Sequence, residues 1–170
     1  MQVHSLIYWT AFIPRDGDAK SDVMRRNRRT AFNEPGVVLF SSDSSHSTLD
    51  PIKAAPILFN DCDDALRADG IAMLVREPTS DDIEQILSPG RFGRVPKFYI
   101  CATRDAVIHP EAQYDMAHDA CVRAMFELDG GHMAHFTQPA VFAGVLARAI
   151  GAAIACVEEQ AAHGSLPSDA

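Results

Sequence analysis

The feature that most constrains the fold is an unbroken apolar and aromatic run near the start of the chain. It extends from Leu6 to Ile13 and ends at Pro14. A run without polar alternation is typical of a strand buried on both faces, and such strands lie in the middle of parallel sheets. We therefore expect a parallel sheet that begins almost at the first residue.

Two more strands and two long helices are predicted in the second half of the chain. The strands are expected at 95–102 and 122–128, and the helices at 110–120 and 139–159. Pro110 suits the first position of its helix, and the last helix repeats apolar residues at helical spacing. The half alternation of 122–128 indicates a strand near a sheet edge. Strands that alternate with helices predict the α/β class with a parallel sheet.

The middle of the chain lacks this regular alternation. Residues 41–47 are polar and predict a mobile loop. Short helices are typical of a cap inserted between two strands, so we predict one domain over 1–163, a cap over about 33–90 and a polar tail over 164–170. Within this cap, short helices are expected at 51–59, at 63–75, and at 81–87 with Thr79 or Ser80 as N-cap. Another helix, from Asp18 or Ser21 to Arg29, is expected before the cap.

Charge and composition argue against a nucleic-acid-binding protein. The net charge is −8, whereas such proteins present a basic face. One basic run, Arg25–Arg29, is interpreted as a solvated surface, with a phosphate- or acid-binding patch as the alternative.

Cysteine spacing and the first residues predict a cytoplasmic protein. The four cysteines lie far apart without a Cys-x-x-Cys pair, which favours neither a zinc site nor a disulfide framework. Reduced thiols in the cytosol are the simplest interpretation. The first residues lack the basic and apolar regions of a signal peptide. No apolar run is expected to reach the roughly 18 residues of a membrane helix, so no membrane association is predicted.

Two candidate catalytic residues follow the second and third expected strands. Asp105 comes after the strand at 95–102, and His132 comes after the strand at 122–128. Catalytic groups gather beyond the carboxyl ends of parallel strands, where a carboxylate can fix the tautomer of a histidine and stabilise its imidazolium. Gly130 and Gly131 allow a tight turn before the histidine. Spacing alone leaves open that Asp105 is a turn residue or helix cap and His132 a solvated side chain.

A serine nucleophile is missing from this arrangement. It would lie on a strand-to-helix elbow of the form Gly-x-Ser-x-Gly, and the 170 residues contain no such segment. Ser5 begins a strand instead of following one, and the serines of 41–47 have no elbow glycines. Cys101 lies inside a strand, where a buried structural thiol is expected.

Four segments carry a resemblance to a known family. They are 6–17 with its Ala-Phe-x-Pro and Asp-Gly, Phe59–Cys62, Val95–Asp105 and Gly130–Pro139. In this order, over most of residues 3–150, they resemble the second half of an α/β-hydrolase. The similar branch holds the plant methylesterases, the hydroxynitrile lyases and their bacterial relatives. The resemblance implies a partial α/β-hydrolase fold, with the C-terminal strands of a mostly parallel sheet, flanking helices and a helical cap insertion.

The resemblance also implies roles for individual residues. Asp105 resembles the triad acid and His132 the triad base. Met133 fits the esterases of this branch, because its lyases have a lysine after the histidine. His135 is expected to be a pocket or surface histidine, and a His132/His135 metal pair would need further ligands. No cofactor and no metal are expected.

The function implied is hydrolysis of a small-molecule carboxylic ester by a serine esterase, of which this chain holds the acid and the histidine. Without the serine, the chain is expected to be truncated and inactive by itself. The alternatives are a degenerate, non-catalytic hydrolase half that binds a ligand, and a half completed by another chain. The open edge of the strand at 6–13 would favour such a complementing chain or a homo-oligomer.

Overall fold

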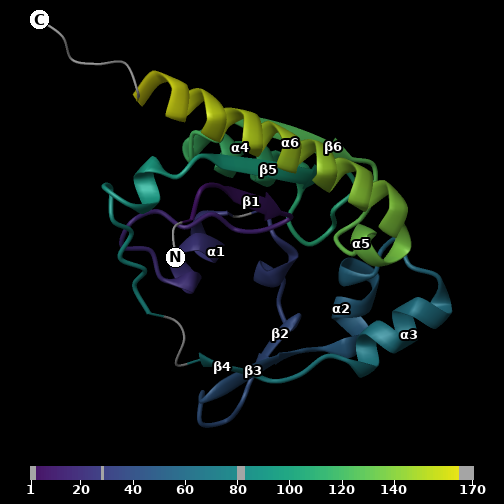
Figure 1. The fold of residues 1–170 in the computed structure, drawn as a ribbon. Coiled ribbons are helices and arrows are strands. Elements are labelled where there is room, and N and C mark those ends of the chain that lie inside the picture. Colours follow the sequence, from purple (N-terminus) through teal and green to yellow (C-terminus); the bar gives the residue numbers. More distant parts are fainter. Residues whose placement is uncertain (1–2, 28, 80–82, 165–170) are drawn as a thin grey trace, which may run out of the picture.

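A parallel sheet of three strands, in the order β1-β5-β6, lies at the centre of the molecule (Figure 1). The computed structural model describes residues 3–27, 29–79 and 83–164, the last three of them by backbone alone. It confirms the α/β class and the parallel sheet that the sequence predicts. The strands are β1 (Leu6–Trp9), β5 (Lys97–Ala102) and β6 (Ala124–Leu128).

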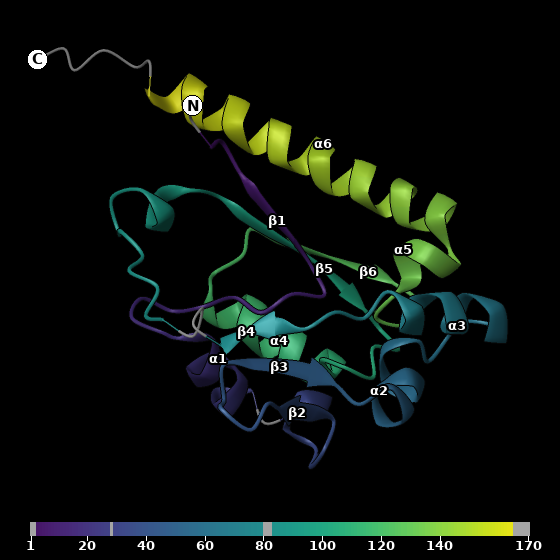
Figure 2. The ribbon, with the colours of Figure 1, turned by 90° about the horizontal axis from the view of Figure 1, so that it is seen from below.

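Helices cover both faces of this sheet. Figure 2 shows the sheet between α6 (Pro139–Gly164) on one side and α4 (Pro110–Asp119) on the other. Successive side chains of a strand point to opposite faces, so Ile100 packs against α6 while Tyr99 and Cys101 pack toward α4. Every residue of β5 is buried, as its apolar sequence predicts.

β1 is shorter and less buried than the apolar run predicts. The strand ends at Trp9, because Thr10 has a φ of +39°, outside the extended region. Ile13, beyond this break, packs with Tyr99 in the core. In the described part of the chain, β1 pairs with β5 alone and its side chains are half-buried. β6 lies at the opposite edge, and this edge position confirms its prediction.

The segment between β1 and β5 holds a second, antiparallel sheet that the sequence analysis missed. Its strands are β2 (Val38–Phe40), β3 (His46–Leu49) and β4 (Glu77–Pro78), in that order. The prediction of a loop over 41–47 is therefore wrong at its end, where His46 and Ser47 belong to β3. The turn is organised by the carboxylate of Asp43, which accepts hydrogen bonds from Ser41 and Ser45.

The short helices of this segment agree with the sequence in part. α2 (Pro51–Leu58) and α3 (Asp64–Ala72) form as predicted, with Asp50 and Asp63 as N-caps. α1 (Lys20–Arg26) is shorter than predicted, and its N-cap is Ala19 because Asp18 binds the guanidinium of Arg26 instead. Residues 83–87 are not helical, and residues 80–82 and Arg28 lie outside the described residues. The remaining helical segments are η1 (Ala31–Asn33), η3 (Phe92–Arg94) and α5 (Ala134–Thr137).

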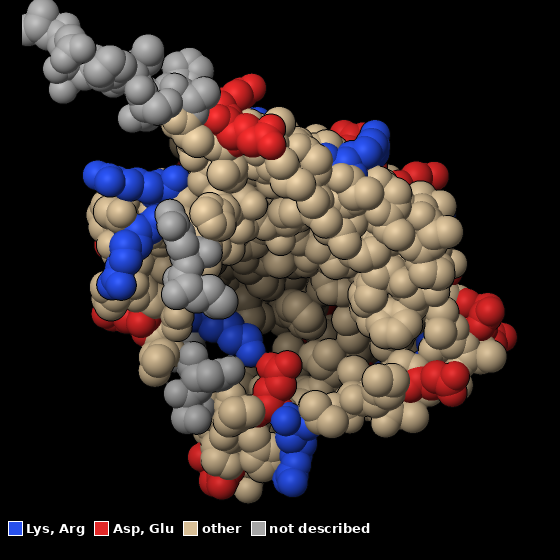
Figure 3. Space-filling view, in the orientation of Figure 1, with Lys and Arg blue, Asp and Glu red and all other residues tan. Residues whose placement is uncertain are grey.

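α6 is long and apolar enough to cross a membrane, so the expectation that no run reaches that length is wrong. The stretch Pro139–Ala161 has a mean hydropathy of 2.1. One such helix is weak evidence for a membrane, since a core helix passes the same test. Val145, Ala149 and Ala153 of α6 are buried, the first two in the core cluster around Ile100. The outer face stays exposed, as the large uncharged surface over α6 in Figure 3 shows.

Candidate catalytic site

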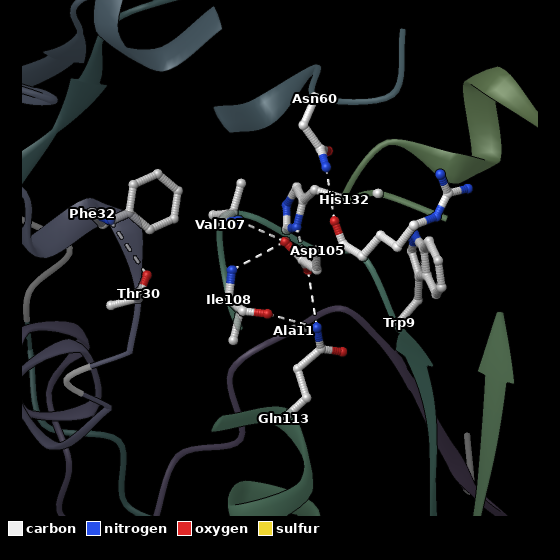
Figure 4. Close-up of polar contacts among 12 residues, drawn as sticks. Trp9, Ala11, Thr30, Phe32, Asn60, Asp105, Val107, Ile108, Gln113 and His132 are labelled. Atoms are coloured by element: carbon white, nitrogen blue, oxygen red, sulfur yellow. Dashed lines mark hydrogen bonds and ion pairs between the residues drawn. The ribbon is translucent and has the colours of Figure 1, made fainter. Parts of the chain in front are cut away.

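Asp105 and His132 meet at the carboxyl edge of the parallel sheet. Ala102 and Leu128 are the last paired residues of β5 and β6, and the two side chains follow them in the next loops. Nδ1 of His132 lies 2.9 Å from Oδ2 of Asp105. The structure therefore brings together the two residues that the sequence singled out (Figure 4).

The carboxylate of Asp105 accepts every hydrogen bond that it makes. Oδ1 accepts from the backbone N–H groups of Val107, at 2.7 Å, and Ile108, at 3.0 Å. Oδ2 accepts from the side-chain amide of Gln113 at 3.0 Å. Asp105 is only 2% exposed. Because the carboxylate is an acceptor, His132 donates from Nδ1, and its Nε2 keeps a lone pair that can accept a proton.

The loops that carry the two residues are joined by backbone hydrogen bonds. Thr103 N donates to Leu128 O and Arg104 N donates to Gly130 O, both at 2.9 Å. The Arg104 guanidinium also pairs with Asp129 at 2.8 Å, where both side chains are largely exposed. The backbone bonds extend the pairing of β5 with β6 past the ends of the strands, so the two loops are bonded directly to each other.

A turn in the segment between β1 and β5, where the cap is predicted (the cap segment below), reaches both loops. Sequence reasoning missed this connection. Asn60 donates from Nδ2 to Arg104 O at 2.7 Å, and Asp61 accepts at Oδ2 from Gly131 N at 2.7 Å. Figure 4 shows Asn60 beside Asp105 and His132, opposite Gln113. The available signal was a pair of polar residues between the apolar Phe59 and Cys62.

Gln113 was also missed. It is fully buried on α4, next to the apolar Ala112, and its amide also donates to Ile108 O at 2.7 Å. A glutamine on the buried face of a predicted helix requires a polar partner. That requirement could have pointed to the carboxylate of Asp105.

His135 lies on α5, three residues after His132, and is half-buried. Its Nδ1 accepts a hydrogen bond from Trp9 Nε1 at 3.3 Å, which joins α5 to the end of β1. Burial lowers the pKa of His135 below its ordinary value, and the nearby His132 lowers this pKa further. Among the described residues, no group of three or more His, Cys, Asp or Glu side chains is arranged to hold a metal ion.

Neither the serines of the β2–β3 turn nor Cys101 replaces the missing serine. Ser41, Ser44 and Ser45 form the turn of the β2–β3 hairpin. Cys101 is fully buried in β5, and burial raises the pKa of its thiol to about 12. A thiol of this kind is a poor nucleophile, because the thiolate is the reactive form.

Three cavities of the described chain are not lined by the Asp105–His132 pair. One of about 380 Å³ is lined mainly by apolar side chains of α1, the antiparallel sheet and the segment after α3. Larger ones of about 680 and 740 Å³ lie near α4 and near the N-terminal end of β5. In the described ranges none of the three is lined by Asp105 or His132. Figure 3 also shows a hollow between α6 and the cap segment.

Comparisons with known proteins reveal similar chains. No model of a known protein family matches the sequence. A probable hydrolase of Phoma sp. is 25% identical over 154 residues, which cover 88% of this chain and 60% of that protein. The chain thus spans well under two thirds of the length of this curated relative.

Three solved structures share the fold at low sequence identity. Polyneuridine aldehyde esterase matches with a TM-score of 0.68 and 16% identity over 81% of this chain and 58% of that one. A methylesterase from Arabidopsis matches at 0.67 and 16% over 88% and 59%. Tomato methylketone synthase I, bound to β-ketoheptanoate, matches at 0.72 and 14% over 86% and 61%.

Proposed function

We propose, from the premise that this chain has part of the α/β-hydrolase fold and resembles its methylesterase branch, that Asp105 and His132 are the acid and the general base of a serine esterase. The premise is the partial fold that the sequence analysis expects, and the comparisons confirm it. The single observation that carries the proposal is the 2.9 Å hydrogen bond between His132 and the buried carboxylate of Asp105.

The reaction would follow from the direction of this bond. A serine Oγ attacks the ester carbonyl while His132 Nε2 takes its proton, and the carboxylate of Asp105 stabilises the resulting imidazolium. His132 then gives the proton to the leaving alcohol. Water then attacks the acyl carbon while His132 takes a proton from it. The bond between the acyl group and the serine Oγ breaks, His132 returns the proton to Oγ, and the acyl group leaves as a carboxylic acid. Asp105 stays an acceptor throughout, since backbone donors occupy its other oxygen.

The serine would come from a segment outside these 170 residues, either in the same polypeptide or in a second chain. Two surfaces support such a neighbour. In the described chain β1 pairs with β5 alone, so its other edge offers unpaired backbone groups. The outer face of α6 exposes Val141 (52%) and Ile154 (54%). A strand added in parallel would cover the free edge of β1, with its right-handed crossover helix on the same face of the sheet as α4, and a further helix of the neighbour would cover α6.

The proposed substrate is a small carboxylic ester with an apolar part. Met133, directly after the base, is apolar and packs against the cluster that holds Val107 and Phe59. The names of the similar proteins include esterases and a hydrolase. The apolar cavity beside the antiparallel sheet would extend such a site once the segment with the serine is present.

One observation favours a second candidate function. Because the 170 residues contain no Gly-x-Ser-x-Gly segment, the chain could instead be a non-catalytic hydrolase half that binds a ligand or a partner. In that case no longer chain or partner would supply a serine to His132.

The decisive experiment starts from the DNA upstream of the codon for Met1. We expect an adjoining reading frame, or a partner gene, that encodes Gly-x-Ser-x-Gly. The protein containing both parts should hydrolyse p-nitrophenyl acetate and react with a fluorophosphonate probe at that serine. His132→Ala and Asp105→Ala should each abolish turnover, whereas Cys101→Ala should retain it.

The isolated chain provides the matching negative result. It should show no His132-dependent hydrolysis of p-nitrophenyl acetate. Clear turnover by the isolated chain that disappears in His132→Ala would contradict the need for an external serine. Equal activity of the longer protein with and without His132 would refute the assignment of the base.

A further inference from the structure

We infer that Asn60 and Asp61 are positioning residues that hold the backbone directly before the candidate acid and directly before the candidate base. The inference rests on the proposed roles of Asp105 and His132. It extends the site to a turn of the cap segment that would touch neither the substrate nor the reacting atoms. Four observations support it: the anchoring of this turn, the three hydrogen bonds of its side chains, the close approach at Gly131 and the bond between the two loops.

The turn itself is firmly anchored. Cys62 N donates to Phe59 O at 3.1 Å, so Asn60 and Asp61 are its central residues. Phe59 is 4% exposed and Cys62 6%, and both belong to the core cluster that holds Val107 and Ile108. The anchors therefore pack against the same residues whose N–H groups bind Asp105. A turn fixed in this way can hold its two polar side chains in one place.

Asp61 holds the residue directly before His132. Its Oδ2 accepts from Gly131 N at 2.7 Å and from the Thr137 hydroxyl at 3.3 Å. These two donors flank the base, one on each side along the chain. Hydrogen bonds to a charged acceptor are stronger than neutral ones. Asp61 thus fixes both ends of the segment that carries the imidazole.

Asp61 also has a buried oxygen, Oδ1, without a partner in the described part of the chain. An unpaired buried carboxylate oxygen is destabilising. A Cβ on Gly131 would lie 2.7 Å from this oxygen and 2.2 Å from Asn60 Oδ1. Both side chains therefore lie so close to the backbone at Gly131 that a larger residue would not fit there. This close approach shields Asp61 Oδ1 from water, which is unfavourable. We interpret the unfavourable burial as a consequence of the hydrogen bond that Asp61 makes to Gly131 N.

Asn60 holds the residue directly before Asp105. Its Nδ2 donates to Arg104 O at 2.7 Å, and Arg104 N donates to Gly130 O at 2.9 Å. The turn, the loop that carries Asp105 and the loop that carries His132 are thus each hydrogen-bonded to the other two. Without the hydrogen bond of Asn60 or of Asp61, one loop is no longer bonded to the turn. We therefore expect the loss of either bond to weaken the hydrogen bond between His132 and Asp105.

The test measures that bond directly, by NMR on the 170-residue chain. A histidine N–H donated to a buried carboxylate gives a proton signal at low field, which His132→Gln assigns by removing it. In Asp61→Ala and Asn60→Ala this signal should broaden or disappear. Amide exchange at Gly131 in Asp61→Ala should rise by about tenfold or more.

Asp61→Asn keeps an acceptor oxygen for Gly131 and should restore most of the signal. Asp69→Ala removes an exposed carboxylate from α3 and should leave the signal unchanged. Thermal melts verify that each variant is folded. If Asp61→Ala does not fold, Asn60→Ala and Asp61→Asn still carry the test.

The outcomes separate the two proposals. A native chain without the low-field signal would count against the Asp105–His132 pair, and thus against the proposed function. A native signal that persists unchanged in both Asp61→Ala and Asn60→Ala would overturn the positioning role alone. Equal loss of the signal in Asp69→Ala would do the same, because it would indicate general loosening of the cap.

Discussion

The candidate acid, Asp105, and the candidate base, His132, are held in different ways. Asp105 is fixed by its own loop and the next helix, since Val107, Ile108 and Gln113 all donate to its carboxylate. The base loop is fixed from outside, through Asp61 and the backbone bonds to the acid loop. The position of Asp105 therefore depends on residues close to it in the sequence. The position of the base depends on segments far away in the sequence.

The largest expected effect tests the local structure of the acid. Asp105→Ala leaves buried donors of Val107, Ile108 and Gln113 without an acceptor. Each such group costs about 1–3 kcal/mol, so we expect the free energy of unfolding to fall by about 3 kcal/mol. Urea denaturation followed by circular dichroism measures this change. A loss below about 1 kcal/mol would show that the donors find other partners.

The second-largest effect tests whether Asn60 and Asp61 hold the loop that carries His132. Gly131→Ala adds a Cβ that would lie 2.2 Å from Asn60 Oδ1. The cap turn must move, at a cost of about 2 kcal/mol. Gly144→Ala on α6 is the matched control, because nothing lies within 4 Å of its added Cβ. Equal melting temperatures for the two variants would contradict the close approach.

A substitution of Gln113 tests how much the hydrogen bond from α4 to Asp105 contributes to stability. Gln113→Ala removes a donor to Asp105 and to Ile108 O, and we expect a loss of about 1–2 kcal/mol by urea denaturation. The exposed Gln160 on α6 provides the control, and Gln160→Ala should be neutral. No difference between the two variants would mean that the backbone donors alone hold the acid.

His135 gives a smaller, pH-dependent effect on the base side. Its pKa is lowered in the folded chain by burial and by His132. The unfolded chain therefore binds more protons as the pH falls below about 6.5, the ordinary value for histidine, and the folded state loses stability there. Thermal melts between pH 7 and 5 should decline less steeply in His135→Leu than in the native chain. Parallel slopes would contradict the direction of this shift.

The smallest effect concerns the exposed ion pair that joins the loops. The side chains of Arg104 and Asp129 are 55% and 84% exposed, and pairs of this kind contribute at most about 1 kcal/mol. Arg104→Ala keeps the backbone bonds and should change the free energy of unfolding by less than about 0.5 kcal/mol. A larger loss would mean that the side chains, and not the backbone, connect the two loops.

The parts of the fold that the sequence predicts are those with local signals. The apolar run of β5, the helical spacing in α6 and the proline that begins α4 identify their elements directly. The missed parts depend on distant contacts. Thr10 ends β1 with a positive φ that its residue type does not signal, and the β2–β3 hairpin depends on Asp43 binding its neighbours.

The candidate site follows the same rule. Asp105 and His132 could be found because each follows a predicted strand, and parallel strands bring such loops together. Asn60 and Asp61 could not be assigned, since their partners lie on segments whose packing the sequence pattern does not give, and Gln113 gave only the indirect signal of a polar residue on a buried helix face. The domain bounds, the catalytic roles, the partner chain and the cytoplasmic location stay predictions.

The register of β5 against β6 has a consequence for how chains of this kind can vary. Ala102 of β5 pairs with Leu128 of β6 on the neighbouring strand. Backbone hydrogen bonds continue this pairing beyond the strand ends, as far as Arg104 and Gly130. Inserting a residue between Leu128 and His132, or deleting one, would shift the imidazole past the carboxylate by a whole step of the ladder. Variation in length should therefore concentrate in the cap segment, while these two short loops keep their number of residues.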